Sequence, residues 1–113
     1  MALFRVPVLP EPALEASAAF HAQVLPGVLA RLAAGPDDLV LVFAPADHTH
    51  RGWRLALVQQ LAREQAPVRV NAVESDDEPA IAAAEAFLAN AAGLTGQLLP
   101  LDSHGAGDML ALG

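Results

Sequence analysis

The chain has 113 residues, 54% of them hydrophobic, and a formal net charge of −7. This length fits one domain, and an acidic chain without lysine argues against nucleic acid or an anionic membrane as a partner. Cysteine is absent, which excludes disulfides and thiol chemistry. The longest apolar run, residues 39–46, is well short of the roughly 20 residues of a membrane span, and the first five residues do not resemble a signal peptide. We therefore expect a soluble cytoplasmic protein.

The first third of the chain predicts a strand followed by a helix. Residues 3–9 favour a strand, but Pro7 cannot donate to a ladder and restricts it to a sheet edge, and the sequence leaves open whether it joins the sheet. Residues 13–34 repeat apolar side chains at the helical period, with a kink expected at Pro26-Gly27. Gly35-Pro36 should end this helix.

The middle of the chain predicts a buried strand over residues 39–44, because a continuous β-favouring apolar run is typical of a parallel sheet covered on both faces. In the loop that follows, Asp47 or Thr49 could cap a helix over residues 50–65. The apolar arc of this helix spans roughly 200°, broken by Arg54, whereas packing on one sheet needs a stripe only somewhat wider than 100°. We interpret the surplus as an interface, most simply across a dimer axis, formed by Trp53, Leu57, Leu61 and Val58.

The last third predicts a strand over residues 68–73, a helix over 79–90 preceded by the acidic segment 74–78, and a strand over 97–101. Such alternation with short connections predicts an α/β, three-layer, Rossmann-like half with a small, mostly parallel sheet of three or four strands and three helices. We expect one domain over residues 1–102 and a flexible, Gly-rich tail over residues 103–113.

The predicted helices and strands, in their order along the chain and in their spacing, resemble the C-terminal half of the short-chain dehydrogenase/reductase (SDR) family. The resemblance covers residues 18–102 and is strongest in LALVQQLAREQAPVRVNAV (55–73) and AIAAAEAFLANAAGLTGQLLPLD (80–102). It implies a truncated, degenerate member that lacks the first mononucleotide-binding half.

The same resemblance implies that the family's catalytic parts are missing. No Gly-rich cofactor turn precedes residue 39, and Ala44-Pro45 stands where the family has its catalytic serine. The positions of the Tyr-x-x-x-Lys pair hold Asp47 and Arg51, and Glu74-Ser75 replaces the Pro-Gly and substrate-covering segment. We therefore assign no catalytic or cofactor-binding residue and expect no cofactor.

Several histidines and aspartates follow the carboxyl ends of predicted strands, and open α/β sheets place their ligands at this edge. His48 and His50, with His104 after Asp102, could form a divalent metal site, although polar loop residues and helix caps explain the same pattern. His21 is expected to be a hydrogen-bonded, partly buried residue and Glu85 a solvated one.

These observations predict a non-catalytic SDR-like protein that acts as a homodimer or higher oligomer, or by pairing with a full-length SDR subunit. Two alternatives stay open. One is a subunit of an NAD(P)-dependent oxidoreductase that needs a partner to complete its site, and the other is a small metal- or ligand-binding module.

Overall fold

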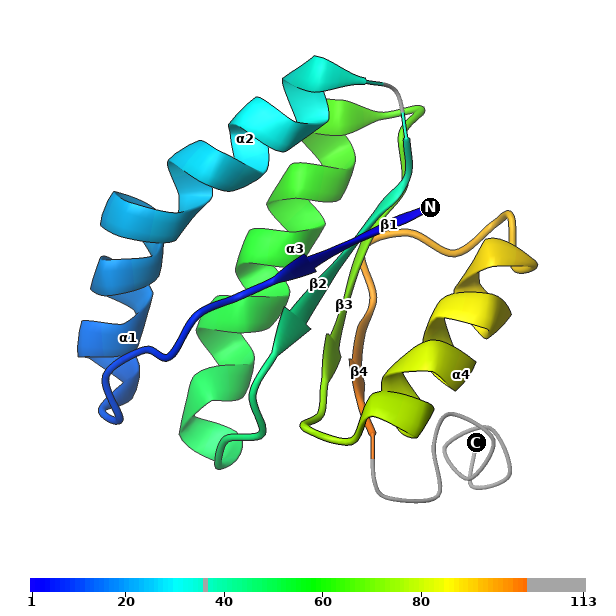
Figure 1. Ribbon diagram of the computed structural model, residues 1–113. Coiled ribbons are helices and arrows are strands. Elements are labelled where there is room, and N and C mark those ends of the chain that lie inside the picture. The colour runs from blue at the N-terminus through cyan, green and yellow to red at the C-terminus, as the bar shows by residue number, and fades with distance from the viewer. Residues whose placement is uncertain (36, 102–113) are drawn as a thin grey trace.

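The chain folds around a four-stranded, all-parallel sheet in the order β1-β2-β3-β4, seen in a computed structural model (Figure 1) that describes residues 1–35 and 37–101. The strands are β1 (Ala2–Arg5), β2 (Leu39–Phe43), β3 (Val70–Glu74) and β4 (Leu98–Pro100). The helices are α1 (Ala13–Ala19), α2 (Leu25–Ala34), α3 (Arg51–Gln65) and α4 (Glu78–Ala89). A π-helical turn, η1 (Phe20–Val24), joins α1 to α2, and a 3-10 turn, η2 (His48–His50), leads into α3. This arrangement confirms the predicted α/β class.

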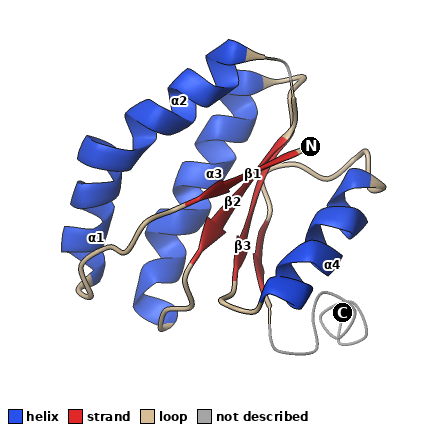
Figure 2. Cartoon of the chain, viewed as in Figure 1, coloured by secondary structure: helices blue, strands red, loops and turns tan. Residues whose placement is uncertain are grey.

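Helices cover both faces of the sheet, with α1, α2 and α3 on one side and α4 on the other (Figure 2). The larger core lies under the first three helices, where Phe20, Val28 and Val58 pack on Leu41 and Ala72. The smaller core lies under α4, and its members are Val40, Val42, Val73, Ile81, Ala84 and Leu88. All three connections step in the same direction across the sheet. The connection through α4 therefore has the opposite hand to the two others, a departure from the usual rule for parallel strands.

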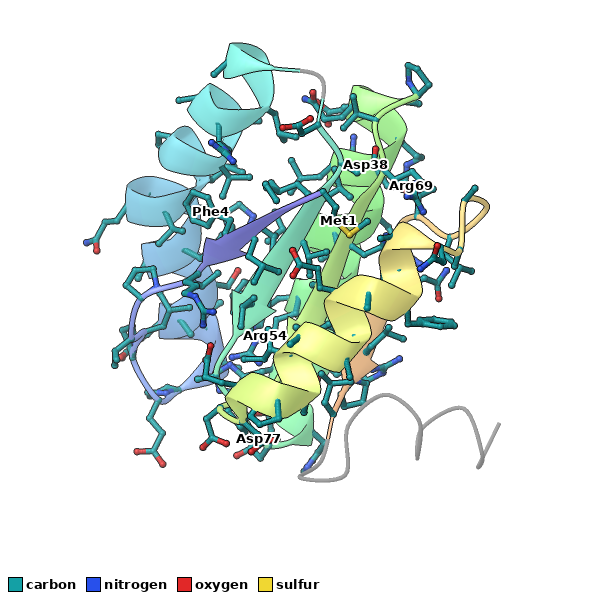
Figure 3. All side chains as sticks on the ribbon, turned by 45° about the vertical axis from the view of Figure 1, so that its right-hand side comes forward. Met1, Phe4, Asp38, Arg54, Arg69 and Asp77 are labelled. Atoms are coloured by element: carbon teal, nitrogen blue, oxygen red, sulfur yellow. The ribbon has the colours of Figure 1, made fainter. Side chains whose placement is uncertain are left out.

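The N-terminal segment does join the sheet, as a short edge strand. The N–H of Ala2 donates to the Asp38 carbonyl and that of Val6 to the Val42 carbonyl, both at 2.9 Å. Phe4 lies on the side of α1 and α2, and Met1 on the side of α4 (Figure 3). The strand ends at Arg5, earlier than the predicted residue 9, because Pro7 cannot continue a ladder.

The first helix is distorted before its proline. We predicted a kink at Pro26-Gly27, but the irregular turn is η1, which ends at Val24. Pro26 lies in the first turn of α2, where its missing N–H costs little. The wider π turn accommodates the ring that would otherwise crowd the preceding carbonyls.

Two polar side chains fix the connections at the amino ends of the strands. The buried Asn71 accepts from the Gln97 N–H at 3.0 Å and donates to the Leu94 carbonyl at 3.1 Å, which anchors the segment before β4. Arg69 pairs with Asp38 at 2.9 Å and donates to the carbonyls of Leu88 and Ala91 at the end of α4. Figure 3 shows Asp38 and Arg69 side by side.

Within the described part of the chain, every helix is too short or too polar to cross a lipid bilayer. The predicted tail, together with Asp102 and His104, lies outside the described residues.

Candidate functional site

The carboxyl edge of β1 and β2 contains a cavity of about 290 Å³. The loop after β1 forms one wall and the loop after β2 the other, with His50 and Arg54 from the start of α3 between them. Most of the lining is apolar, contributed by Val6 to Pro10 and Phe43 to Ala46. This is the edge at which a parallel α/β sheet places its ligands.

Arg54 is a buried polar group at this edge, whereas in the sequence it stands out only as a break in the apolar arc of its helix. Its side chain is 5% exposed, and Nη1 donates to Glu74 Oε2 at 2.7 Å and to the Ala44 carbonyl at 2.9 Å. The guanidinium lies 4.5 Å from the centre of the Phe43 ring. Nε has no partner among the described residues. Arg54 thus joins α3 to the ends of β2 and β3 (Figure 3), and Glu74 neutralises its charge.

His50 is buried at the same edge, and each of its ring nitrogens makes a hydrogen bond. Its Nε2 lies 2.8 Å from the Glu11 carbonyl, which can only accept, and its Nδ1 lies 3.2 Å from the indole N–H of Trp53, which can only donate. These partners assign the neutral tautomer with hydrogen on Nε2. Both ring nitrogens therefore serve to fasten the loop before α1 to α3.

Asp47 stands where the family resemblance expects a tyrosine, and it caps the 3-10 turn η2 rather than α3. Its Oδ1 accepts from the Thr49 N–H at 2.9 Å and from the Thr49 hydroxyl. The predicted cap thus acts one turn earlier than expected, and α3 itself, with His50 at its N-cap position, has no side-chain cap. These hydrogen bonds, the hydroxyl contributing most, hold the pKa of the Asp47 carboxyl below its ordinary value. The residue is a carboxylate near neutral pH and cannot donate a proton there.

The metal-site prediction is only partly covered by the structure. His48 is exposed, and a metal at His50 would have to displace one of its two hydrogen bonds. The residues that the structure describes contain no group of three His, Asp or Glu side chains able to hold a metal ion. His104 lies outside them, so this site stays a prediction.

A second hollow of about 500 Å³ lies on the helical face, and we call it the helix groove. One wall comes from the N-terminal helical stretch and carries Ser17, His21, Leu25 and Leu29. The other comes from α3 and carries Trp53, Ala56, Leu57, Gln60, Leu61 and Glu64. Most of its lining is apolar, and its polar side chains stand at its ends.

The predicted interface residues divide between this groove and the core. Trp53 is half-buried, and Leu57 and Leu61 line the floor with 6% and 5% of their surface exposed. Val58 is fully buried against the sheet and adds no surface. The wide apolar arc of α3 is largely used within the chain, because the helix packs both on the sheet and against the N-terminal helix. The interface itself stays a prediction.

The wall formed by His21, Leu25 and Leu29 was not predicted as part of this surface. Leu29 is 42% exposed, and His21 is exposed rather than partly buried as expected. The available signal was the four-residue spacing from Ser17 to Leu29, which places these side chains on one helical face.

Comparison with known proteins gives one informative result. Searches of curated proteins and of solved structures returned no match. The family model described as "Short chain dehydrogenase-like protein" matches residues 4–101, which include the end of β1 and the whole of β2, β3 and β4. This agrees with the order of strands and helices, and the chain is accordingly a member of the short-chain dehydrogenase-like family.

Proposed function

We propose that this protein acts by association through the helix groove, with a second copy of itself as partner, and does not itself transfer hydride. The open apolar groove between the N-terminal helix and α3 is the observation that carries the proposal.

The carboxyl edge supports the non-catalytic part of the proposal. Proton transfer to a carbonyl requires a group that holds a proton near neutral pH. Asp47 is ionised and engaged as a helix cap, and Ala44 has no side chain that could polarise a carbonyl. Arg54 and His50 are both held in structural contacts.

The helix groove supports association because its walls form a seam that a helix can enter. Residues 53, 56, 57, 60, 61 and 64 of α3 follow the spacing of a helix-packing face, and Leu25 and Leu29 extend it on the opposite wall. Contiguous apolar surface of this kind marks interaction sites in soluble proteins. Ala56 near the middle is small enough to allow close approach.

The test measures mass in solution. Analytical ultracentrifugation at micromolar concentration should give a dimer for the wild type and a monomer for Leu29→Glu, which places a charge inside the groove. Leu29 is already 42% exposed, so the substitution should leave the fold, and hence the circular dichroism spectrum, unchanged.

Leu14→Glu is the matched control, since Leu14 is 84% exposed on the same helical stretch and does not line the groove. This variant should remain a dimer. A wild-type chain that is monomeric at micromolar concentration contradicts self-association. If that monomer then gains mass on addition of a full-length SDR subunit, the groove's partner is that subunit instead.

A further inference from the structure

The cavity at the carboxyl edge holds a buried guanidinium with unused donors. Arg54 lines the cavity, its side chain is 5% exposed, and its Nη1 donates to Glu74 and to the Ala44 carbonyl. Neither Nε nor Nη2 donates to a described residue, and Nε is also enclosed by protein atoms. The N–H groups of Nη2 are therefore the donors left for a bound molecule. Because an unpaired buried donor is costly, this part of the cavity favours a ligand with an acceptor atom.

The guanidinium is held in position by its own chain. Nη1 is anchored by its two hydrogen bonds, and the carbon that joins the three nitrogens lies 4.5 Å from the ring centre of Phe43 and 5.7 Å from that of Trp53. The two loops that form the cavity walls carry three prolines, Pro7, Pro10 and Pro45. Each proline ring fixes φ, which stiffens the walls. Donor and walls are thus arranged in advance, which lowers the cost of ordering them when a ligand binds.

The charges around the cavity favour an uncharged ligand. Glu74 already neutralises Arg54, and the described lining includes two more acids, Glu11 and Asp47. A ligand carboxylate would bring a further negative charge to this group, and repulsion is stronger where water is scarce. A ligand N–H, in contrast, can donate to either acid. No described donor reaches the Glu11 carboxylate or Oδ2 of Asp47.

The size of the cavity limits the ligand. Its volume of about 290 Å³ lies near the lower limit for ligand pockets and corresponds to about ten water molecules. From the donor, the acids and the apolar walls, we propose that this cavity binds a small uncharged amide with an apolar substituent. The amide oxygen accepts from Nη2 of Arg54, and the amide N–H donates to an acid of the lining.

This site goes beyond the proposed association and does not depend on it. Among the described residues, none lines both the cavity and the helix groove. Arg54 stands at none of the positions where the family resemblance places its serine, tyrosine and lysine. Recognition through this guanidinium is therefore a feature of this chain.

Three probes of equal size test the chemistry of the ligand: isovaleramide, isobutyl methyl ketone and isovalerate. The ketone has a methyl group in place of the amide nitrogen, and isovalerate carries a charge. Proton–nitrogen correlation NMR at pH 7 follows each titration through the Nε–H of Arg54 and the backbone N–H groups of Ala44 and Ala46. The amide should bind in the millimolar range, as expected for so small a molecule. It should bind at least about fivefold more tightly than the other probes, which corresponds to one hydrogen bond.

Two variants test the site. Ala46→Phe places a ring in the cavity from an exposed position and should weaken amide binding at least about tenfold. R54M/E74Q removes the donor together with its counter-charge and should weaken amide binding at least about fivefold. Arg51→Met is the control for loss of an arginine from α3, because Arg51 is exposed and lies outside the cavity lining. The same spectra show whether each variant is folded.

Each outcome decides for or against the site. An amide that fails to bind the wild type, or that binds Ala46→Phe or R54M/E74Q as tightly as the wild type, overturns the proposal. A ketone or isovalerate that matches the amide overturns the ligand class. Weaker binding to both variants, with Arg51→Met unchanged, supports the proposal. The oligomeric state enters none of these results, so failure of the proposed self-association would leave them unaffected.

Discussion

Replacing Arg54 by methionine tests the buried ion pair at the carboxyl edge. Methionine retains the bulk of the side-chain stem and its contact with the sheet but removes the guanidinium. The Arg54 side chain is 5% exposed and that of Glu74 is 13% exposed, so both charges are largely out of water. Removing one partner of a fully buried pair costs roughly 3–5 kcal/mol, because the other charge is left uncompensated. Glu74 keeps some contact with water, and we expect Arg54→Met to cost about 3 kcal/mol.

A double-mutant cycle separates this coupling from lost packing. Glu74→Gln keeps one acceptor oxygen for Nη1 but leaves the buried guanidinium without a counter-charge, at an expected cost of about 2–3 kcal/mol. The double variant R54M/E74Q carries neither charge. It should lose only about 2 kcal/mol, well below the sum of the two single losses.

Urea unfolding at pH 7 measures these free energies of unfolding from the transition midpoint and slope. Arg51→Met is the control, because Arg51 is exposed on the same turn of α3, and it should stay within about 0.5 kcal/mol of the wild type. A double variant as unstable as the two single losses combined would show that Arg54 and Glu74 are not coupled, and the account of this edge would then be wrong.

Three further substitutions test the fold. Asn71→Leu should cost about 2 kcal/mol and remove hydrogen-exchange protection from the Gln97 N–H, since the buried amide holds both that N–H and the Leu94 carbonyl. Burial opposes ionisation of Asp38, but the N–H and guanidinium of Arg69 outweigh it and lower the pKa of the carboxyl. Asp38→Asn should therefore cost about 1 kcal/mol above pH ~5, and the difference from the wild type should vanish in urea titrations as the pH falls through the lowered pKa. Gly96→Ala should lower the melting temperature by the equivalent of about 1 kcal/mol, because Gly96 has a φ of +74°.

The strands and helix starts that depend on neighbouring residues in the sequence could be predicted. Residues 39–44 are a continuous run of β-favouring side chains, and all five residues of β2 are buried. Asp47 and Asp77 follow the rule for helix caps, and each accepts from a backbone N–H in the first turn of the helix after it. In these cases the local sequence is enough, because the energy depends on near neighbours.

The remaining features depend on contacts between distant residues. Arg54 reads as a charge within an apolar helix face, and its role depends on Glu74, twenty positions further along the chain. Pro26 predicts a distortion in this helix, but the position of the π turn η1 also involves Phe20 within it, whose ring centre lies 5.7 Å from that of Phe43 and 5.6 Å from that of Trp53. The width of the α3 arc likewise reflects packing against the N-terminal helix, which periodicity along α3 alone cannot show.

Asp47, at the position where the family resemblance places a tyrosine, shows how helix capping and proton donation compete at one carboxyl group. A helix cap requires an acceptor, and the hydrogen bonds that make Asp47 a good cap also lower the pKa of its carboxyl. A general acid at the same position would have to keep its proton near neutral pH. These two requirements exclude each other, because a stronger cap lowers the pKa further and leaves the carboxyl without a proton to donate near neutral pH. At the carboxyl edge Arg54 holds α3 to the ends of the strands, whereas the helix groove presents apolar surface that no residue among 1–35 and 37–101 covers.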